Sequence, residues 1–495
     1  MLLSLSRQDS SFTLATDLYE LTMALGYWKN GMAEREAVFH MFFRENPFAG
    51  GFVVMAGLEN LIGHLREFRF SKGDLEYLAT LNDTAGNRLF GEDFLRYLEA
   101  MELTCDLHAV PEGTVVFPNE PLVRVQGPIL QAQLLESLLL NILNFQSLIA
   151  TKAARVCLAA QGDPVIDFGL RRAQGLDGAL SASRASYVGG CVGTSNVLAG
   201  KLLGIPVYGT HAHSWVMAFE SEQEAFAAYA RAMPDNCMFL VDTYGTLSGL
   251  RNAVAVAKQL LKQGHRITGV RLDSGDLAYF SKQARRMLDD AGLHDALVMG
   301  SNELDEYVIR SLKTQGACIN AWGVGTKLVT ANDDPALSGV YKLTALRGAE
   351  NGKWEYKLKL SEQKFKINIP GILQSYRYYD SGGRPNADAV LEISEDPERV
   401  DSIIDPNDNT HRKKFRAGGK FEPLLHPVFC KGKLVYETPP LEEVRKRSLA
   451  QLDGLDDSHK RIENPHIYPV GLTPNLNQIR DEMITRERER LNSGD

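Results

Sequence analysis

The chain has 495 residues, of which 44% are hydrophobic and 23% are charged, and its formal net charge is −8. This length predicts two to four domains with a large buried core. The composition is that of an ordinary globular protein. The negative charge argues against nucleic acid as a partner, because nonspecific binding to nucleic acid needs a cationic surface.

The cysteines and the apolar segments point to a cytoplasmic protein that does not cross a membrane. Six cysteines are scattered along the chain without a C-x-x-C pair, which favours reduced thiols over a disulfide framework or a zinc site. The most apolar long segment, residues 134–149, contains Glu136 and three amide side chains. We therefore expect a core helix there, not a membrane span.

Residues 1–145 are predicted to form an α+β domain. Asp17 has the features of a helix cap, with Glu20 three residues later in the position of a capping box. Residues 37–43 and 52–55 are rich in strand-forming side chains. A long helix from about residue 131 to residue 156 is expected to lead into the next domain.

Residues 146–345 show a regular α/β alternation. Helical segments separate six short apolar strands, which we expect at residues 165–166, 206–208, 239–241, 270–272, 297–299 and 320–322. This alternation predicts parallel strands, in a barrel or an open doubly wound sheet. Residues 346–430 are expected to supply strands and loops that return to the first domain. Residues 431–495 are expected to form a charged C-terminal extension.

Each of the six expected strands ends in polar or glycine-rich residues. In a barrel the carboxyl ends of the strands share one face, where active sites lie, so we expect a shared ligand site. The residues concerned are Asp167–Arg172, Thr210–Ser214, Asp242–Gly245, Asp273–Asp276, Gly300–Glu303 and Gly323–Lys327.

The residue types at these ends suggest particular chemistry. A neutral imidazole can accept a phosphoryl group, and both His211 and His213 are candidates for that role. Asp273 and Asp276 could hold ribose hydroxyls or Mg²⁺, although either could instead cap a helix. The glycines at 323 and 325 would let backbone N–H groups approach a phosphate closely.

Five of these motifs, in this order, resemble those of nicotinate phosphoribosyltransferases: Thr16–Tyr19, Asp167–Arg172, Gly209–Ser214, Arg271–Asp276 and Gly323–Thr326. The resemblance extends from about Thr13 to Lys431–Tyr436. It implies an irregular, TIM-like α/β barrel of the type II phosphoribosyltransferase kind, with an N-terminal α+β domain and a C-terminal extension. It also implies a homodimer whose sites form at the subunit interface.

The same resemblance implies the reaction. Phosphoribosyl pyrophosphate and nicotinate would give nicotinate mononucleotide and pyrophosphate, the first step of NAD salvage from nicotinate. ATP would be a co-substrate, hydrolysed through a phosphohistidine, and Mg²⁺ a cofactor whose protein ligands are left unassigned. Neither nucleic acid nor a membrane is expected as a partner.

The resemblance also assigns roles to residues. Catalytic roles fall to His213, Arg271 and Asp273, and His213 would be the phosphohistidine. Phe168 would stack on nicotinate opposite Tyr19 of the partner subunit, with Arg171, Thr210 and Arg271 near the carboxylate. Arg172 is expected either there or in an ion pair. Phosphoribosyl pyrophosphate would contact Asp273, Ser301, Asn302, Gly323, Gly325 and Thr326.

Two alternative functions remain at this stage. A nicotinamide phosphoribosyltransferase would need an acidic acceptor for the amide, and the corresponding run, Val197–Gly204, contains no acid. A regulatory barrel that binds phosphate without catalysis is the second alternative. The presence of His213, Arg271 and Asp273 together argues against it.

Overall fold

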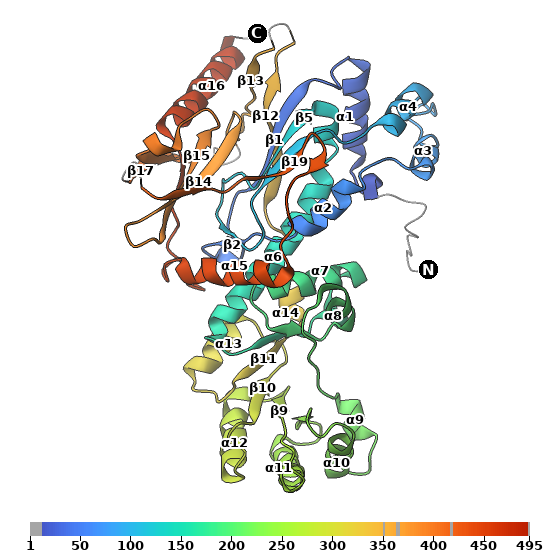
Figure 1. The fold of residues 1–495 in the computed structure, drawn as a ribbon, viewed down its shortest axis with the longest axis vertical. Coiled ribbons are helices and arrows are strands. Elements are labelled where there is room, and N and C mark those ends of the chain that lie inside the picture. The colour runs from blue at the N-terminus through green and yellow to red at the C-terminus, as the bar shows by residue number, and fades with distance from the viewer. Residues whose placement is uncertain (1–11, 350–351, 363–366, 416–418, 494–495) are drawn as a thin grey trace.

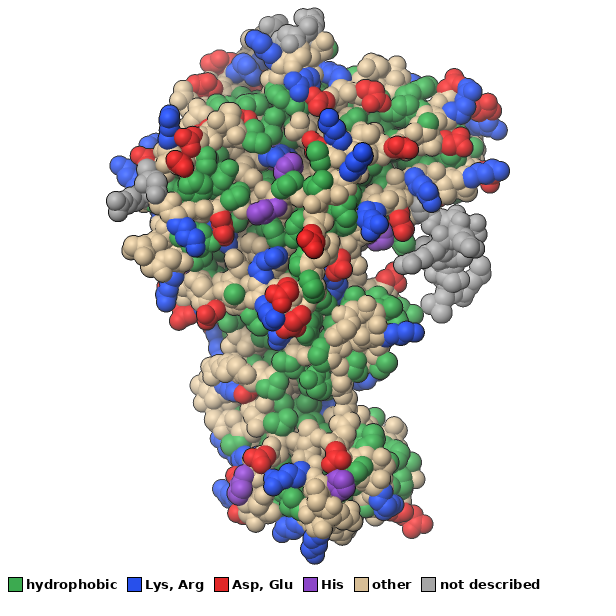
Figure 2. Space-filling view, in the orientation of Figure 1, with side chains coloured by type: hydrophobic (Ala, Val, Ile, Leu, Met, Phe, Trp, Pro, Cys, Tyr) green, Lys and Arg blue, Asp and Glu red, His purple; other side chains and the backbone are tan. Residues whose placement is uncertain are grey.

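The computed structural model describes residues 12–349, 352–362, 367–415 and 419–493. The chain forms a broad upper lobe and a smaller lower lobe joined by a narrow waist (Figure 1). The upper lobe contains the N-terminal and C-terminal parts of the chain, and the lower lobe contains the middle part. On the face shown in Figure 2, hydrophobic side chains are visible around the waist.

The main sheet of the upper lobe has the strand order β13-β12-β1-β5-β3-β19-β20, and its described strand pairs are antiparallel. It joins parts of the chain that are remote in sequence, because β12 pairs with β1 and β19 pairs with β3. The strands are β1 (Glu36–Phe43), β3 (Asp106–Ala109), β5 (Val123–Pro128), β12 (Gly339–Arg347), β13 (Trp354–Tyr356), β19 (His426–Cys430) and β20 (Lys433–Leu434). A separate pair of short strands, β2 (Val53–Val54) and β4 (Val115–Val116), contacts helix α6 (Glu136–Ala160) through β2.

Helix α1 (Leu18–Lys29) begins where the sequence predicts, but the predicted capping box is wrong. Asp17 occupies the N-cap position without a side-chain capping bond; its carboxylate accepts a hydrogen bond from the Ser137 hydroxyl (3.2 Å). Glu20 is buried and accepts a hydrogen bond from the backbone N–H of Ser137 (3.1 Å). Both acids therefore hold α1 against the start of α6 (Glu136–Ala160). The other helices here are α2 (Leu58–Arg66), α3 (Lys72–Leu78), α4 (Glu92–Ala100) and α5 (Ile129–Gln133).

Helix α6 runs from the upper lobe into the waist (Figure 1). One described segment that includes it, Ile129–Ala160, is long and apolar enough to span a membrane by length and composition alone, and 61% of its most apolar window is buried inside the protein. Its charged side chains Lys152 and Arg155 are also buried. A helix that buries charges against other parts of the same chain is a core helix, as the sequence predicts.

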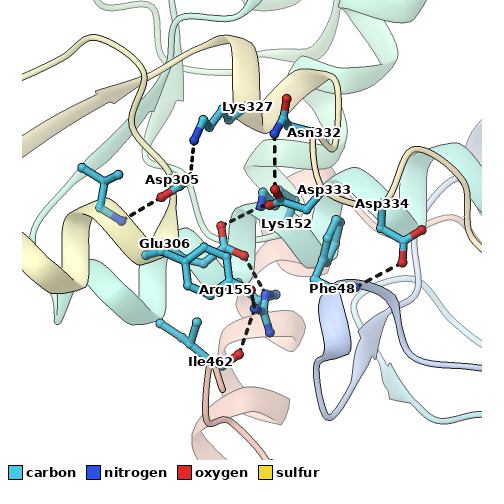
Figure 3. Close-up of polar contacts among 12 residues, drawn as sticks. Phe48, Lys152, Arg155, Asp305, Glu306, Lys327, Asn332, Asp333, Asp334 and Ile462 are labelled. Carbon is cyan, nitrogen blue, oxygen red and sulfur yellow. Dashed lines mark hydrogen bonds and ion pairs between the residues drawn. The ribbon is translucent and has the colours of Figure 1, made fainter. Parts of the chain in front are cut away.

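A buried ionic network surrounds those two charges at the waist (Figure 3). Lys152 Nζ lies 2.8 Å from a Glu306 oxygen and 2.7 Å from an Asp333 oxygen. Arg155 Nε donates to the other Glu306 oxygen (2.8 Å), and the backbone N–H of Phe48 donates to Asp334 (3.2 Å). The network thus joins α6 to α13 (Glu306–Thr314), the 332–334 loop and the short helix η2 (Pro47–Ala49).

The lower lobe is built on a six-stranded parallel sheet of order β7-β6-β11-β10-β9-β8. Its strands are β6 (Val165–Asp167), β7 (Gly193–Thr194), β8 (Met238–Leu240), β9 (Gly269–Leu272), β10 (Leu297–Gly300) and β11 (Ala321–Val324). The helices around it are α7 (Gly175–Val188), α8 (Val197–Leu203), α9 (His213–Met217), α10 (Glu222–Ala232), α11 (Thr246–Lys262), α12 (Leu277–Asp290), α13 and α14 (Thr326–Val329).

Two details of this sheet differ from the expected pattern. The strand β7 was not expected, and the strand expected at residues 206–208 is reduced to a single bridge between Val207 and Thr194. The described pairs leave β7 and β8 at the two ends of the sheet. The fold is therefore mixed α/β, and closure into a barrel stays a prediction.

A third sheet, of order β17-β16-β21-β15-β14-β18, packs with α16 (Pro474–Ser493) in the upper lobe. Its strands are β14 (Leu373–Tyr379), β15 (Pro385–Glu392), β16 (Ser402–Asp405), β17 (Asp408–Lys414), β18 (Phe421–Pro423) and β21 (Val470–Leu472). Helix α15 (Leu441–Gly454) packs against α7 at the waist. The four-part division of the chain also stays a prediction.

Candidate active site

The carboxyl ends of the parallel strands surround a pocket of about 240 Å³. Every residue to which the family resemblance assigns a role lines it, except His213 and Tyr19; the other two candidates, His211 and Asp276, do not line it either. The lining residues are Phe168, Arg171, Arg172, Ser195, Gly209, Thr210, Arg271, Asp273, Ser301, Asn302, Glu303, Gly323, Gly325 and Thr326. Of these, Ser195, Gly209 and Glu303 had no expected role. Parallel strands bring these ends together because all of them end at one edge of the sheet.

Arg271, at the end of β9, is the residue that connects the pocket walls. Its Nε donates to the Ser301 hydroxyl (2.8 Å), and the two terminal nitrogens donate to Thr210 Oγ1 (3.0 Å) and Asp273 Oδ1 (2.8 Å). The guanidinium also lies 5.4 Å from the centre of the Phe168 ring. Three of its five N–H groups are used in these bonds, so two remain for a ligand.

Phe168 is held beside the strand β11. Its backbone N–H donates to the carbonyl of Val324 (2.8 Å), and its ring covers Gly323 so closely that a Cβ there would lie 2.6 Å from ring carbons. Glycine at position 323 is therefore needed to make room for the ring. The preceding Asp167 is buried and accepts hydrogen bonds from the Gly169 N–H (2.7 Å) and the Thr194 hydroxyl (2.8 Å), which fixes the turn.

Two loops, residues 301–303 and 323–326, also line the pocket. Asn302 has φ 106°, a region that residues other than glycine rarely adopt, and such strain concentrates at ligand sites. The Thr326 hydroxyl donates to Glu303 (3.4 Å) across the pocket. Behind them, Lys327 Nζ lies 2.6 Å from Asp305, whose other oxygen caps α13 by accepting from the Val308 N–H (2.7 Å). The Lys327–Asp305 pair is drawn in Figure 3.

His213 stands at the start of α9, just outside the pocket lining. Its Nδ1 is 3.1 Å from the Thr243 hydroxyl, and its Nε2 is 3.9 Å from Asp273 Oδ2. The His213 side chain is 42% exposed. The imidazole therefore faces the same Asp273 that Arg271 holds.

His211 lies in a different environment. It is buried next to Phe226, Tyr229 and Phe239, and the backbone N–H of Leu240 donates to its Nε2 (3.2 Å). Burial lowers the pKa of His211 to about 4, so the ring is neutral. A ring nitrogen that accepts a buried backbone hydrogen bond is not free to attack phosphorus.

Asp242, after β8, belongs to the site but was not assigned a role from the sequence. Its Oδ2 accepts hydrogen bonds from the Asp273 N–H (3.1 Å) and the Ser274 hydroxyl (2.5 Å). Its Oδ1 is buried without a hydrogen-bond partner among the described residues. Asp276, by contrast, is a helix cap, since its carboxylate accepts from the Tyr279 N–H (2.9 Å) at the start of α12.

Two other parts of the chain that the sequence connected with nicotinate, Tyr19 and residues 197–204, lie outside the pocket lining. Tyr19 lies on α1 in the upper lobe, is 45% exposed and does not line the pocket of its own chain. The run Val197–Gly204, whose lack of an acid was taken to disfavour nicotinamide, forms α8 and its C-cap and does not line the pocket either. The absence of an acid from this run therefore does not distinguish nicotinate from nicotinamide, because the run is not part of the pocket lining.

A mixed α/β fold with an arginine-rich pocket at the carboxyl edge of a parallel sheet is typical of enzymes that bind small anionic substrates. Three family models match the chain: the nicotinate phosphoribosyltransferase N-terminal domain over residues 14–144, the nicotinate phosphoribosyltransferase family over 164–353, and the nicotinate phosphoribosyltransferase C-terminal domain over 373–480. The chain belongs to the nicotinate phosphoribosyltransferase family.

Individual relatives agree over almost the whole length. The nicotinate phosphoribosyltransferase of Bacillus subtilis is 43% identical over 491 residues, which cover 98% of this chain and 97% of that protein. The crystal structure of human nicotinic acid phosphoribosyltransferase superposes with a TM-score of 0.82 at 34% identity, covering 94% and 99%. A nicotinate-nucleotide pyrophosphorylase from Pyrococcus furiosus shares the fold, with a TM-score of 0.70 at 22% identity and coverage of 92% and 98%.

Proposed function

We propose that this chain transfers the phosphoribosyl group of phosphoribosyl pyrophosphate to nicotinate, giving nicotinate mononucleotide and pyrophosphate in NAD salvage. The observation that carries the proposal is the pocket in which Arg271 links Phe168, Thr210, Ser301 and Asp273. Family membership supports it, and the six cysteines, all free, fit a cytoplasmic enzyme.

The nicotinate end of the pocket is the side formed by Phe168 and the arginines. The Phe168 ring offers a face on which a pyridine can stack. Arg171, Arg172 and the two remaining N–H groups of Arg271 offer charge-assisted hydrogen bonds to a carboxylate. An amide in place of the carboxylate would lose that charge, which favours nicotinate over nicotinamide.

The sugar phosphate would lie between residues 301–303 and 323–326, next to the Phe168 ring, which covers Gly323. Asp273 would bind ribose hydroxyls, and Gly325, Asn302 and Thr326, which line the pocket, would contact the 5′-phosphate. Departure of pyrophosphate from the anomeric carbon leaves positive charge on the sugar as the pyridine nitrogen attacks. The carboxylate of Asp273 would stabilise that charge, and the fixed positions of both substrates would supply most of the rate enhancement.

The carboxylates of the site suit Mg²⁺. In the described part of the chain no three His, Cys, Asp or Glu side chains form a metal-binding group. However, Mg²⁺ is commonly held by one or two carboxylates plus substrate phosphates. Asp242 Oδ1, buried and without a partner, and Asp273 would be those ligands. When bound, Mg²⁺ would neutralise the charge of the departing pyrophosphate.

We also propose that His213 carries the phosphoryl group that couples ATP hydrolysis to transfer. Thr243 orients its ring through Nδ1, and Nε2 faces the solvent side near Asp273. Phosphorylation there would place negative charge beside the sugar site and order the cationic groups around the substrate.

Labelling with γ-³²P-ATP tests this role. We expect wild-type protein to incorporate acid-labile, base-stable label and His213→Ala to incorporate none. His265→Ala is the matched control, because His265 is a partly exposed histidine paired with Asp235 (2.8 Å) outside the pocket. Equal label on His213→Ala and wild type would remove the phosphohistidine from the proposal.

The sheet of the lower lobe is proposed to close into an irregular barrel through residues 205–211. Val207 bridges to β7 at one end of the sheet. At the other end, the backbone of β8 is bound by the His211 ring through the Leu240 N–H. At that end the His211 side chain, not a strand, accepts the backbone hydrogen bond of β8. The barrel would therefore be irregular there.

A homodimer would bring Tyr19 to the pocket of the partner subunit. Helix α1 exposes Leu18, Tyr19 and Met23, and α8 exposes Val197, Leu198 and Leu202. Both helices lie on the same side of the molecule (Figure 1), so a twofold axis could set α1 of one chain against α8 of the other. Exposed apolar patches of this kind mark interaction surfaces.

A substrate panel tests the proposed reaction. Purified protein receives phosphoribosyl pyrophosphate with nicotinate, nicotinamide or quinolinate, with and without ATP, and mononucleotide formation is measured. A charge-assisted hydrogen bond contributes about 1.5–3 kcal/mol, so we expect kcat/KM for nicotinate to exceed that for nicotinamide by about 10- to 100-fold. Preference for nicotinamide or quinolinate would refute the substrate assignment.

A further inference from the structure

An ion pair joins the two loops to which the 5′-phosphate is assigned. Lys327 directly follows Thr326 and is the second residue of α14. Asp305 comes just after the 301–303 loop and is the N-cap residue of α13. The Nζ of Lys327 lies 2.6 Å from Asp305 Oδ2. Neither residue lines the pocket, so the pair connects the two loops from outside the pocket lining.

Both oxygens of Asp305 have a partner. Oδ2 accepts the hydrogen bond from Lys327, and Oδ1 accepts one from the backbone N–H of Val308 (2.7 Å) in the first turn of α13. The Asp305 side chain is 5% exposed and the Lys327 side chain 26%. The hydrogen bond to Asp305 raises the pKa of Lys327, so the lysine is cationic. A carboxylate fixed on the helix therefore holds the lysine in one place.

The loop that Asp305 follows contains strained backbone. Asn302, with φ 106°, keeps this conformation only if the chain on both sides of it is held. On one side, the backbone N–H of Ser301 donates to the carbonyl of Leu272 (2.9 Å). On the other side, Lys327 and the first turn of α13 hold Asp305. We expect Asn302 to relax from its place in the pocket lining when the lysine is lost.

A second cation joins α13 to the segment that follows α14 (Figure 3). The Nζ of Lys152 lies 2.8 Å from Glu306 and 2.7 Å from Asp333, and the Lys152 side chain is fully buried. Removal of Lys327 would leave this buried link in place. We therefore expect a variant without Lys327 to fold and to change mainly at the loops beside the pocket.

We propose that Lys327 and Asp305 are a positioning pair for the 5′-phosphate of phosphoribosyl pyrophosphate. The pair fixes the distance between the two loops and acts through Asn302 and Thr326, without a contact to the substrate. This inference rests on the proposed function, which places the 5′-phosphate between these loops. Loss of the pair should weaken binding of phosphoribosyl pyrophosphate, whereas nicotinate, which is assigned to other residues, should bind as before.

Steady-state kinetics of Lys327→Met and Asp305→Asn test the pair. Asparagine removes the charge of Asp305 and keeps an acceptor for the cap of α13. A misplacement of about 1 Å can cost about 100-fold, so we expect the KM for phosphoribosyl pyrophosphate to rise at least about 5-fold in each variant and the KM for nicotinate to stay within about twofold. Because the two residues act as a unit, the double variant should lose no more than either single variant.

Lys313→Met is the matched control. Lys313 also belongs to α13 and pairs with Asp163, with 20% of each side chain exposed, and neither residue lines the pocket. We expect both KM values of Lys313→Met to equal those of the wild type. An equal rise in the KM for phosphoribosyl pyrophosphate in Lys313→Met would refute a specific role of the Lys327–Asp305 pair.

The opposite charges of the two residues separate positioning from simple attraction. If charge alone acted on the phosphate, Lys327→Met would weaken its binding and Asp305→Asn would strengthen it. Positioning predicts weaker binding in both variants. A lower KM for phosphoribosyl pyrophosphate in Asp305→Asn, or wild-type KM values in an active Lys327→Met, would refute this inference alone. Failure of the wild type to form nicotinate mononucleotide would refute the proposed function and this inference with it.

Discussion

Replacement of Arg271 by alanine is expected to lower kcat/KM for nicotinate by about 100- to 1,000-fold, the usual cost of removing one preorganised electrostatic contact. Three partners lose their donor together, since Arg271 binds Thr210, Ser301 and Asp273. Among the described residues, the Asp273 carboxylate would then be held only by the Ser301 hydroxyl (2.5 Å), with His213 nearby. Steady-state kinetics with both substrates varied measure the effect.

A second variant separates the charge of Arg271 from the geometry of its guanidinium, and a third serves as a control. Arg271→Lys keeps the positive charge but loses the planar fork that reaches three partners, so we expect a loss of more than about 10-fold. Arg266→Ala is the control, because Arg266 lies just before β9 and pairs with Asp295 (3.2 Å) on the surface. Wild-type kcat/KM in Arg271→Ala would contradict the proposed pocket.

The polar ends of the parallel strands could be predicted from the sequence because each is a local pattern. An apolar strand followed by polar or glycine residues is visible within ten residues, and five of the six expected strands are confirmed. The two-residue strand β7 is too short to show any periodicity. At residues 206–208 the composition resembles a strand, but the chain makes a single bridge.

Other features of the site depend on contacts that no local pattern reveals. The two histidines at 211 and 213 have similar neighbours in sequence, and only the fold buries His211 against α10 while exposing His213. Asp242 acquires its position because the Asp273 N–H and the Ser274 hydroxyl donate to it from the next strand.

Loss of the Arg184 side chain is expected to lower the free energy of unfolding strongly. Arg184 on α7 donates to both oxygens of Glu112, at 2.7 and 2.8 Å, and also to Glu59 (2.7 Å). Only 2% of the Arg184 side chain and 4% of the Glu112 side chain are exposed. In Arg184→Met the carboxylate of Glu112 stays buried without a cation, so we expect the free energy of unfolding to fall by about 3–5 kcal/mol.

The pH dependence of that loss identifies its cause. Burial alone would raise the pKa of Glu112, but the Arg184 charge and the hydrogen bonds to the carboxylate outweigh it, and the pKa is lowered. A lowered pKa in the folded state means that the wild type gains stability from Glu112 above the unfolded pKa and loses it as the pH falls through the folded pKa. In Arg184→Met, burial raises the pKa of Glu112. Protonation of Glu112 then removes the buried charge and restores part of the stability of the variant.

The difference in stability between wild type and Arg184→Met should therefore be largest near pH 7 and should shrink as the pH falls, as measured by urea denaturation. Arg184→Met/Glu112→Met, which removes both charges, should lose less than the single variant, because no buried charge is left unpaired. Arg88→Met, at an exposed i,i+4 pair, should change stability by less than about 1 kcal/mol. A loss that does not vary with pH would assign the effect to packing of the Arg184 side chain and not to its charge.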